Sequence, residues 1–181
     1  MLIYAETPEQ LIEILSAVLK LLVKAGLKCK GSKCSLFTQT INYLGRVLSI
    51  DGINPDPAKL DKIRQWPKPE KGIGLAAFLE LCNYYRDLIP AFAHISDALY
   101  KLSKADEIPW TEALESKFKE LKQQLLYPRI VRLPDPERPF ILETDGSCVA
   151  VGAVLKQRLY DTGLEHPVGF FSSAFTGSER N

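Results

Sequence analysis

A few polar side chains in this 181-residue sequence could bind metal ions or charged ligands. Asp145 ends a strand-like run and opens the turn Asp145-Gly146-Ser147, which would present its carboxylate at the end of a strand. Mg²⁺ prefers carboxylate oxygen, but a two-ion magnesium site needs several acidic groups. Lys33 follows a helix end at Gly26, and its ammonium can donate a proton or act as a counter-charge. A plain turn aspartate and a solvated loop lysine remain the alternatives.

The cysteines and histidines do not form a recognisable catalytic or metal-binding pattern. Cys29 and Cys34 form a C-x4-C pair, but neither His94 nor His166 lies near it in sequence, so we expect no zinc site. We expect the cysteines to be reduced and mostly buried. No partner for a Ser/His/Asp or Cys/His nucleophile can be identified, so both histidines are interpreted as structural.

Composition narrows the class of protein. Hydrophobic residues make up 46% and charged residues 25%, and the formal net charge is +1. These values exclude a disordered chain and a disulfide-stapled miniprotein, and the apolar runs are too short to cross a membrane. The near-zero charge argues against a molecule that is basic overall, but residues 1–50 have six basic and three acidic side chains. The basic excess at the front is either a solvated helix face or a local binding patch.

Apolar spacing predicts which elements position these residues. Thr7 and Pro8 open a helix that Gly26 ends, and Asp56 and Pro57 open a short second helix. Further helical stripes are expected at 75–89, 92–102 and 114–125. Strands are expected at 34–37, 41–50, 140–144, 149–155 and 167–173. The predicted fold class is α+β.

Six stretches in this order resemble the pol polyprotein of gypsy-class long-terminal-repeat retrotransposons. They are A-G-L-K-C-K-G-S-K-C (25–34), Y-L-G-R-V-L-S-I-D-G-I (43–53), P-D-P-A-K-L-D-K-I-R-Q-W-P-K-P (55–69), F-L-E-L-C-N-Y-Y-R-D-L-I-P-A-F-A (78–93), P-F-I-L-E-T-D-G-S-C-V-A-V-G-A-V-L-K-Q (139–157) and H-P-V-G-F-F-S-S-A-F-T-G-S-E-R-N (166–181). The resemblance covers essentially the whole chain. It implies the end of a reverse transcriptase palm with a hairpin at 1–54, a helical thumb and connection at 55–127, and the first strands of a ribonuclease H-like mixed sheet at 128–181.

The resemblance also implies roles for residues near the polymerase site. Lys33 matches a lysine placed near the incoming triphosphate. Tyr43, Leu44 and Gly45 match the primer grip, a hairpin that positions the primer end, where glycine lets the backbone approach the nucleic acid. An ordinary strand with a glycine bulge is the alternative for these three residues.

On the thumb, Arg86 could reach phosphate, with help from Lys62 and Arg64 on the preceding helix. Tyr85 lies on the apolar stripe and is expected in the core. The family usually has a glycine at Glu80, a departure that weakens the case for an intact nucleic-acid face.

Asp145 matches the first ribonuclease H carboxylate, which would bind Mg²⁺ in the intact parent. The family's polymerase aspartate pair would precede Leu2, and its next ribonuclease H carboxylate would follow Asn181. We therefore expect a fragment of an RNA-directed DNA polymerase/ribonuclease H that is not catalytically competent alone. Its expected partners are an RNA/DNA hybrid or primer–template duplex and the rest of the polyprotein, with no membrane. The alternatives are a non-catalytic nucleic-acid-binding module and a decayed retroelement relic.

Overall fold

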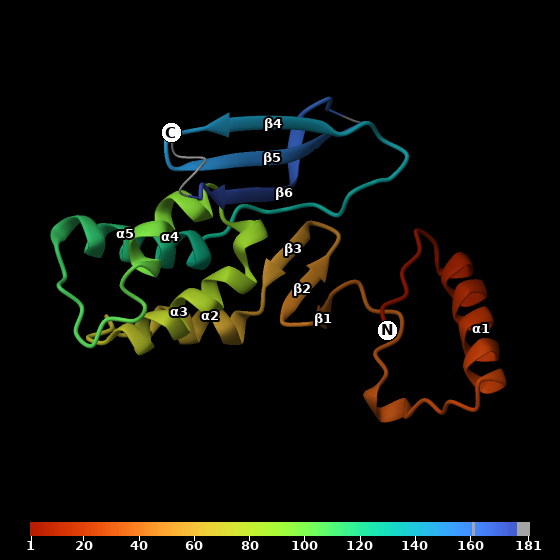
Figure 1. Cartoon of the computed structure of the whole chain (residues 1–181). Helices are drawn as coiled ribbons and strands as arrows, with labels where there is room; N and C mark the ends of the chain where they lie inside the picture. Colours follow the sequence, from red (N-terminus) through yellow and green to blue (C-terminus); the bar gives the residue numbers. More distant parts are fainter. Residues whose placement is uncertain (161, 177–181) are drawn as a thin grey trace.

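The computed structural model describes residues 1–160 and 162–176. Its elements are α1 (Pro8–Lys24), β1 (Ile41–Tyr43), β2 (Arg46–Ser49), β3 (Gly52–Pro55), α2 (Pro57–Arg64), α3 (Gly72–Tyr84), α4 (Phe92–Tyr100), α5 (Glu112–Leu126), β4 (Ile141–Gly146), β5 (Ala150–Arg158) and β6 (Glu165–Ala174). Two 3₁₀ turns lie at Gly31–Lys33 and Arg86–Leu88. Figure 1 shows α1 at one end, the helices α2–α5 at the other, β1–β3 between them, and the β4–β6 sheet across the bundle.

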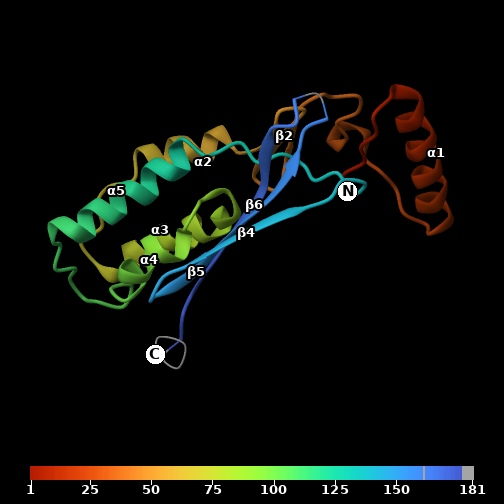
Figure 2. The same cartoon turned by 90° about the horizontal axis from the view of Figure 1, so that it is seen from above.

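Helix α1 forms where the sequence predicts it, because its capping signals are local. The Thr7 hydroxyl accepts a hydrogen bond from the Gln10 backbone N–H at 3.3 Å, and Pro8 occupies the first helical position. Gly26 follows the helix with a φ of 71°, a left-handed conformation that glycine adopts readily. No residue of α1 is buried, and Figures 1 and 2 show the helix standing apart from the bundle.

The first sheet is a three-stranded meander, and here the expected strand boundaries are wrong. Residues 34–37 form no strand, and 41–50 is itself a hairpin because Leu44 and Gly45 turn the chain between β1 and β2. Both turn residues have positive φ, 48° and 69°, as a type I′ turn requires. β3 then pairs with β2 in antiparallel register.

Helices α2–α5 hold the hydrophobic core. The Asp56 side chain caps α2 by accepting a hydrogen bond from the Ala58 N–H at 2.9 Å. The Phe78 ring of α3 packs at 5.8 Å from the Trp66 ring and at 4.7 Å from the Phe118 ring of α5, measured between centroids. Burying a large apolar side chain of this kind contributes about 1.5–3 kcal/mol. Tyr85 is fully buried, as its place on the apolar stripe predicts.

The second sheet, β4–β5–β6, lies over α4 (Figures 1 and 2). Its three described strands are antiparallel. The Ser172 hydroxyl of β6 accepts a hydrogen bond from the buried Ala93 N–H in the first turn of α4, at 2.9 Å. On the way to β4 the chain also meets the first sheet, because the Ile53 N–H donates to the Val131 carbonyl at 2.7 Å. The two sheets and the bundle therefore form one connected body.

These elements confirm the α+β fold class. The cysteines correct another expectation, because Cys29, Cys34 and Cys148 are exposed and only Cys82 is buried. The three exposed thiols lie in loops outside the core, where no apolar packing covers them. Among the described helices, none combines the length and apolar character needed to cross a bilayer.

Candidate nucleic-acid interface

The turn between β1 and β2 is the most closely held part of the predicted interface. Tyr43 pairs with Arg46 across the hairpin, which leaves Leu44 and Gly45 as a two-residue loop. The Leu44 side chain is 71% exposed. The turn therefore presents an apolar side chain on the surface.

Two tyrosines at the end of α3 fasten this turn to the bundle. The Tyr85 hydroxyl donates to the Gly45 carbonyl at 2.7 Å, and the Tyr84 hydroxyl donates to the Leu44 carbonyl. The two rings meet edge to face with centroids 4.8 Å apart. Burial raises the pKa of Tyr85, so its hydroxyl keeps the proton that it donates. Both carbonyls of the turn are thus held by side chains from another element.

Arg46 completes the attachment from the strand side. Its guanidinium makes a two-pronged ion pair with Asp87, with N–O distances of 2.6 and 2.7 Å, and donates to the Tyr84 carbonyl at 3.0 Å. It also lies over the Tyr84 and Tyr85 rings, 5.5 and 5.7 Å from their centroids. The hydrogen bonds that the guanidinium donates to the Asp87 carboxylate raise the pKa of Arg46. We call Arg46, Tyr84, Tyr85 and Asp87 the hairpin clamp.

Sequence reasoning missed three members of the hairpin clamp: Arg46, Tyr84 and Asp87. The local signal of Tyr84 and Asp87 is the polar and aromatic run at the end of α3, and that of Arg46 is one basic residue in β2; neither identifies a partner. The nearest such contact joins residues 38 positions apart.

Arg86 lies at the junction of the helical bundle and the second sheet. Its guanidinium donates to the Ser172 carbonyl of β6 and to the Asn83 side-chain oxygen at 3.5 Å, and it lies 5.6 Å from the Phe92 ring centroid. Arg86 is nonetheless exposed overall. Its phosphate contact stays a prediction, and the structure adds that this arginine joins α3 to β6.

The other predicted cations lie elsewhere on the surface. Lys33 is exposed in the 3₁₀ turn between α1 and β1, which lies away from the β4–β6 sheet (Figure 1). Lys62 and Arg64 are exposed on α2, on either side of buried Ile63, and Arg64 forms an ion pair with Asp61 at 2.6 Å. Lys62 and Arg64 therefore share a helix without sharing a face, and Lys33 lies in a separate segment before β1.

Asp145 stands in β4 opposite Gly152 of β5, and its side chain is exposed. The neighbouring acid Glu143 is paired with Lys156 at 2.6 Å. Within the described residues, no three His, Cys, Asp or Glu side chains come together as a metal site. The described acids thus do not fit a pair of Mg²⁺ ions, which needs several carboxylates held together.

Known proteins are similar to this chain in sequence and in fold. Residues 110–181 match the family model described as the RNase H-like domain found in reverse transcriptase. The Pol polyprotein from transposon 412 of Drosophila melanogaster is 37% identical over 86% of this chain and 12% of its own length. That from transposon 297 is 34% identical over 99% of the chain and 17% of its length. The Transposon Tf2-3 polyprotein of Schizosaccharomyces pombe is 32% identical over 99% of the chain and 14% of its length. The chain spans less than a fifth of these relatives.

Solved structures of the foamy viral protease-reverse transcriptase have the same fold. The complex with RNA/DNA hybrid gives a TM-score of 0.78 at 25% identity, covering 98% of this chain and 24% of that one. The dRH form in complex with double-stranded DNA gives a TM-score of 0.79 at 24% identity, covering 97% and 31%.

Proposed function

Because this chain corresponds along nearly its whole length to a segment of retrotransposon Pol polyproteins, we propose that it joins the polymerase part of a gypsy-class Pol to its ribonuclease H-like domain. In this proposal 1–54 is the end of the palm, 55–127 the thumb and connection, and 128–181 the start of the ribonuclease H-like domain. The complete parent would copy RNA into DNA and degrade the RNA strand of the hybrid.

The role proposed for this segment is to hold a primer–template duplex or an RNA/DNA hybrid. The hairpin clamp is the observation that carries the proposal, because it locks the turn at Leu44 and Gly45 onto α3 through side-chain bonds to both carbonyls. Arg86 then joins the end of α3 to β6. A rigid connection of this kind suits a surface that must keep a nucleic-acid end in register with a distant domain. Foamy viral relatives of the same fold bind double-stranded DNA and RNA/DNA hybrid.

The proposed contacts to nucleic acid are the exposed turn at Tyr43, Leu44 and Gly45, and the cations Lys33, Lys62, Arg64 and Arg86. Basic side chains bind the phosphate backbone without reading sequence, so we expect binding that weakens as salt rises. The segment is proposed to supply positioning, with catalysis dependent on carboxylates from elsewhere in the polyprotein.

The rest of the polyprotein is the proposed partner of α1. The apolar stripe of this helix is partly exposed, and none of its residues is buried. Burial of apolar surface against another surface is favourable by about 25 cal/mol per Å² of area removed from water. We propose that α1 packs against the remainder of the palm in the parent protein.

Binding is tested with a labelled RNA/DNA hybrid and fluorescence anisotropy on the full chain. We expect the affinity to fall steeply between about 50 and 200 mM salt. Lys62→Glu should weaken binding about tenfold, whereas the matched control Lys104→Glu, an exposed loop lysine, should change it much less. Binding that ignores salt, or that responds equally to both substitutions, would contradict the proposal.

Catalysis is tested separately with primer–template, hybrid and Mg²⁺. We expect neither nucleotide addition nor cleavage of the RNA strand by the chain alone. Cleavage that disappears in Asp145→Ala would show that this segment is itself an active ribonuclease.

A further inference from the structure

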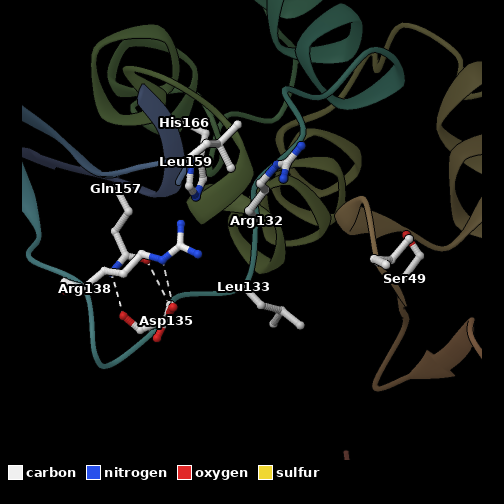
Figure 3. Close-up of a pocket in the computed structure, with 9 residues that line it drawn as sticks. Ser49, Arg132, Leu133, Asp135, Arg138, Gln157, Leu159 and His166 are labelled. Atoms are coloured by element: carbon white, nitrogen blue, oxygen red, sulfur yellow. Dashed lines mark hydrogen bonds and ion pairs between the residues drawn. The ribbon is translucent and has the colours of Figure 1, made fainter. Parts of the chain in front are cut away.

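A pocket lies where the second sheet meets the turn between β2 and β3. Its volume is about 300 Å³, at the lower end of the roughly 300–1,000 Å³ typical of small-molecule sites. The turn at Ser49 and Ile50, the segment 132–138 and the strands β5 and β6 all contribute to its wall. Figure 3 shows the side chains of Arg132, Arg138 and His166 gathered on one side of it.

Arg132 brings a positive charge to this pocket. Its backbone N–H donates to the Pro167 carbonyl of β6 at 3.0 Å, which fixes the residue beside the sheet. In the described part of the chain, no carboxylate forms an ion pair with its guanidinium. Arg132 is therefore a positioned cation whose charge is available to a ligand.

The second arginine of the pocket, Arg138, already forms an ion pair with the acidic residue Asp135. Arg138 Nε pairs with the Asp135 carboxylate at 2.8 Å, and its guanidinium lies 3.6 Å from the Tyr160 ring centroid. The buried Gln157 amide bonds the backbone of Asp135 and Arg138, which holds this segment in shape. The pocket wall therefore has two arginines, Arg132 and Arg138, and one aspartate, Asp135, so its net charge is positive.

His166 supplies a polar atom that lacks a partner. Its Nδ1 is buried and makes no hydrogen bond with any described residue. A buried polar group without a partner costs about 1–3 kcal/mol, so a ligand that bonded it would recover that free energy. Figure 3 shows the imidazole on the same part of the pocket wall as the Arg132 and Arg138 side chains, whose charges both act on it.

The electrostatics agree with this geometry. Burial lowers the pKa of His166, and the positive charges of Arg132 and Arg138 lower it further. An anion in the pocket would oppose both arginines and favour the protonated imidazole, which donates from both ring nitrogens. The charged groups around His166 are Arg132, Arg138 and Asp135 of the linking segment, Arg158 of β5 and Glu165 of β6.

We propose that this pocket binds a phosphate group, with the Arg132 guanidinium as its counter-charge and the His166 imidazole as a hydrogen-bond donor. Guanidinium is the side chain best matched to phosphate oxygens, because its N–H groups form a planar fork. The phosphate can belong to the backbone of a bound nucleic acid or to a free phosphate compound. Only the first of these sources rests on the proposed function.

Inorganic phosphate is the first probe, and its binding is measured from the NMR signals of the histidine imidazoles. The chain has two histidines, so His94→Asn assigns both signals. We expect phosphate to shift the His166 signal saturably and to raise the pKa of His166, with chloride at equal ionic strength as the reference. Arg132→Gln should weaken phosphate binding about tenfold, while the matched control Arg129→Gln, an exposed arginine outside the pocket wall, should not. Melting curves confirm that both variants fold.

A second arm uses duplex DNA in place of phosphate. If the source is a nucleic-acid backbone, duplex DNA will shift the His166 signal. Arg132→Gln will then reduce the slope of log affinity against log salt concentration by about 1, the value for one lost phosphate contact. Phosphate binding without any effect of duplex supports the pocket and assigns it to a free phosphate compound. The proposal is overturned if phosphate leaves the His166 signal unmoved, or if Arg132→Gln and Arg129→Gln weaken binding equally.

Discussion

Arg46 shows how a single side chain can serve two elements at once. Its guanidinium contacts Asp87, the Tyr84 carbonyl and the two tyrosine rings. The side chains of Arg46 and Asp87 are 20% and 44% exposed, so the pair is less screened than one in open solvent. At the residue scale, the end of α3 is therefore an attachment site for the β1–β2 turn.

Because the hairpin clamp is partly buried, breaking its ion pair should lower the free energy of unfolding more than breaking an exposed ion pair. Asp87→Ala removes both hydrogen bonds to a half-buried guanidinium and should lower the free energy of unfolding by about 1.5–3 kcal/mol. Asp61→Ala removes an exposed pair with Arg64 and should cost less than about 0.5 kcal/mol. Urea unfolding of both variants measures the difference, and equal losses would show that the clamp contributes no more than a surface pair.

His166 predicts a pH dependence with a definite sign. Its pKa lies below the ordinary value of 6.5 in the folded chain, so the unfolded chain binds more protons just below pH 6.5. Stability should therefore be full above pH 6.5 and fall as the pH drops below it. Urea unfolding in phosphate-free buffer measures the free energy of unfolding at each pH. Between pH 7.5 and 5 this free energy should fall less in His166→Asn than in the unchanged chain. An identical fall in both would assign the pH dependence to other groups.

At the scale of elements, close backbone approach decides where β3 meets the segment before β4. Gly52 has a φ of 136°, and a Cβ at this position would lie 2.4 Å from the Val131 carbonyl oxygen. That carbonyl accepts the hydrogen bond from Ile53. Glycine is therefore needed here both for its backbone conformation and for the contact between β3 and the segment before β4.

Two glycine substitutions separate these effects. Gly163→Ala, at a φ of 66° with no atom within 4 Å of the added Cβ, should cost about 1–2 kcal/mol from backbone strain alone. Gly52→Ala adds a collision with backbone and should cost about 2–4 kcal/mol. Thermal unfolding tests the order, and a smaller loss for Gly52→Ala would mean that β3 and Val131 separate easily.

At the scale of the whole molecule, the bundle and the second sheet are joined by buried polar contacts. Helix α4 begins at Phe92 after Ala91, which has no capping side chain of its own. Ser172 fills that role from β6, 79 residues away, by accepting from the Ala93 N–H. The sheet thus caps a helix of the bundle.

This long-range cap predicts that one serine couples the two parts. Ser172→Ala leaves the buried Ala93 N–H without a partner and should cost about 1–3 kcal/mol. Hydrogen exchange should speed up in the first turn of α4. Ser173→Ala, an exposed neighbour on the opposite face of β6, is the matched control and should leave α4 unchanged. Equal protection of α4 in both variants would mean that the sheet and bundle are held by other contacts.

Elements with local signals could be predicted from the amino-acid sequence alone. Thr7, Pro8, Asp56 and Pro57 start helices where they were expected, because a cap acts within one turn. Apolar periodicity likewise located the bundle helices and the strands of the second sheet, since it reports which face each element buries. The expectation for 41–50 was wrong because a tight turn at Leu44 interrupts a run whose apolar spacing is that of one strand.

Contacts between side chains of distant elements depend on the packing of the folded chain. Tyr85 and Gly45 are 40 residues apart, and Arg86 and Ser172 are 86 apart, so neither pair leaves a periodic signal in the chain. The pocket at Arg132 and His166 likewise exists only because the segment before β4 folds back on β6. Caps and periodicity are properties of neighbouring residues, whereas clamps and pockets depend on how separate elements pack.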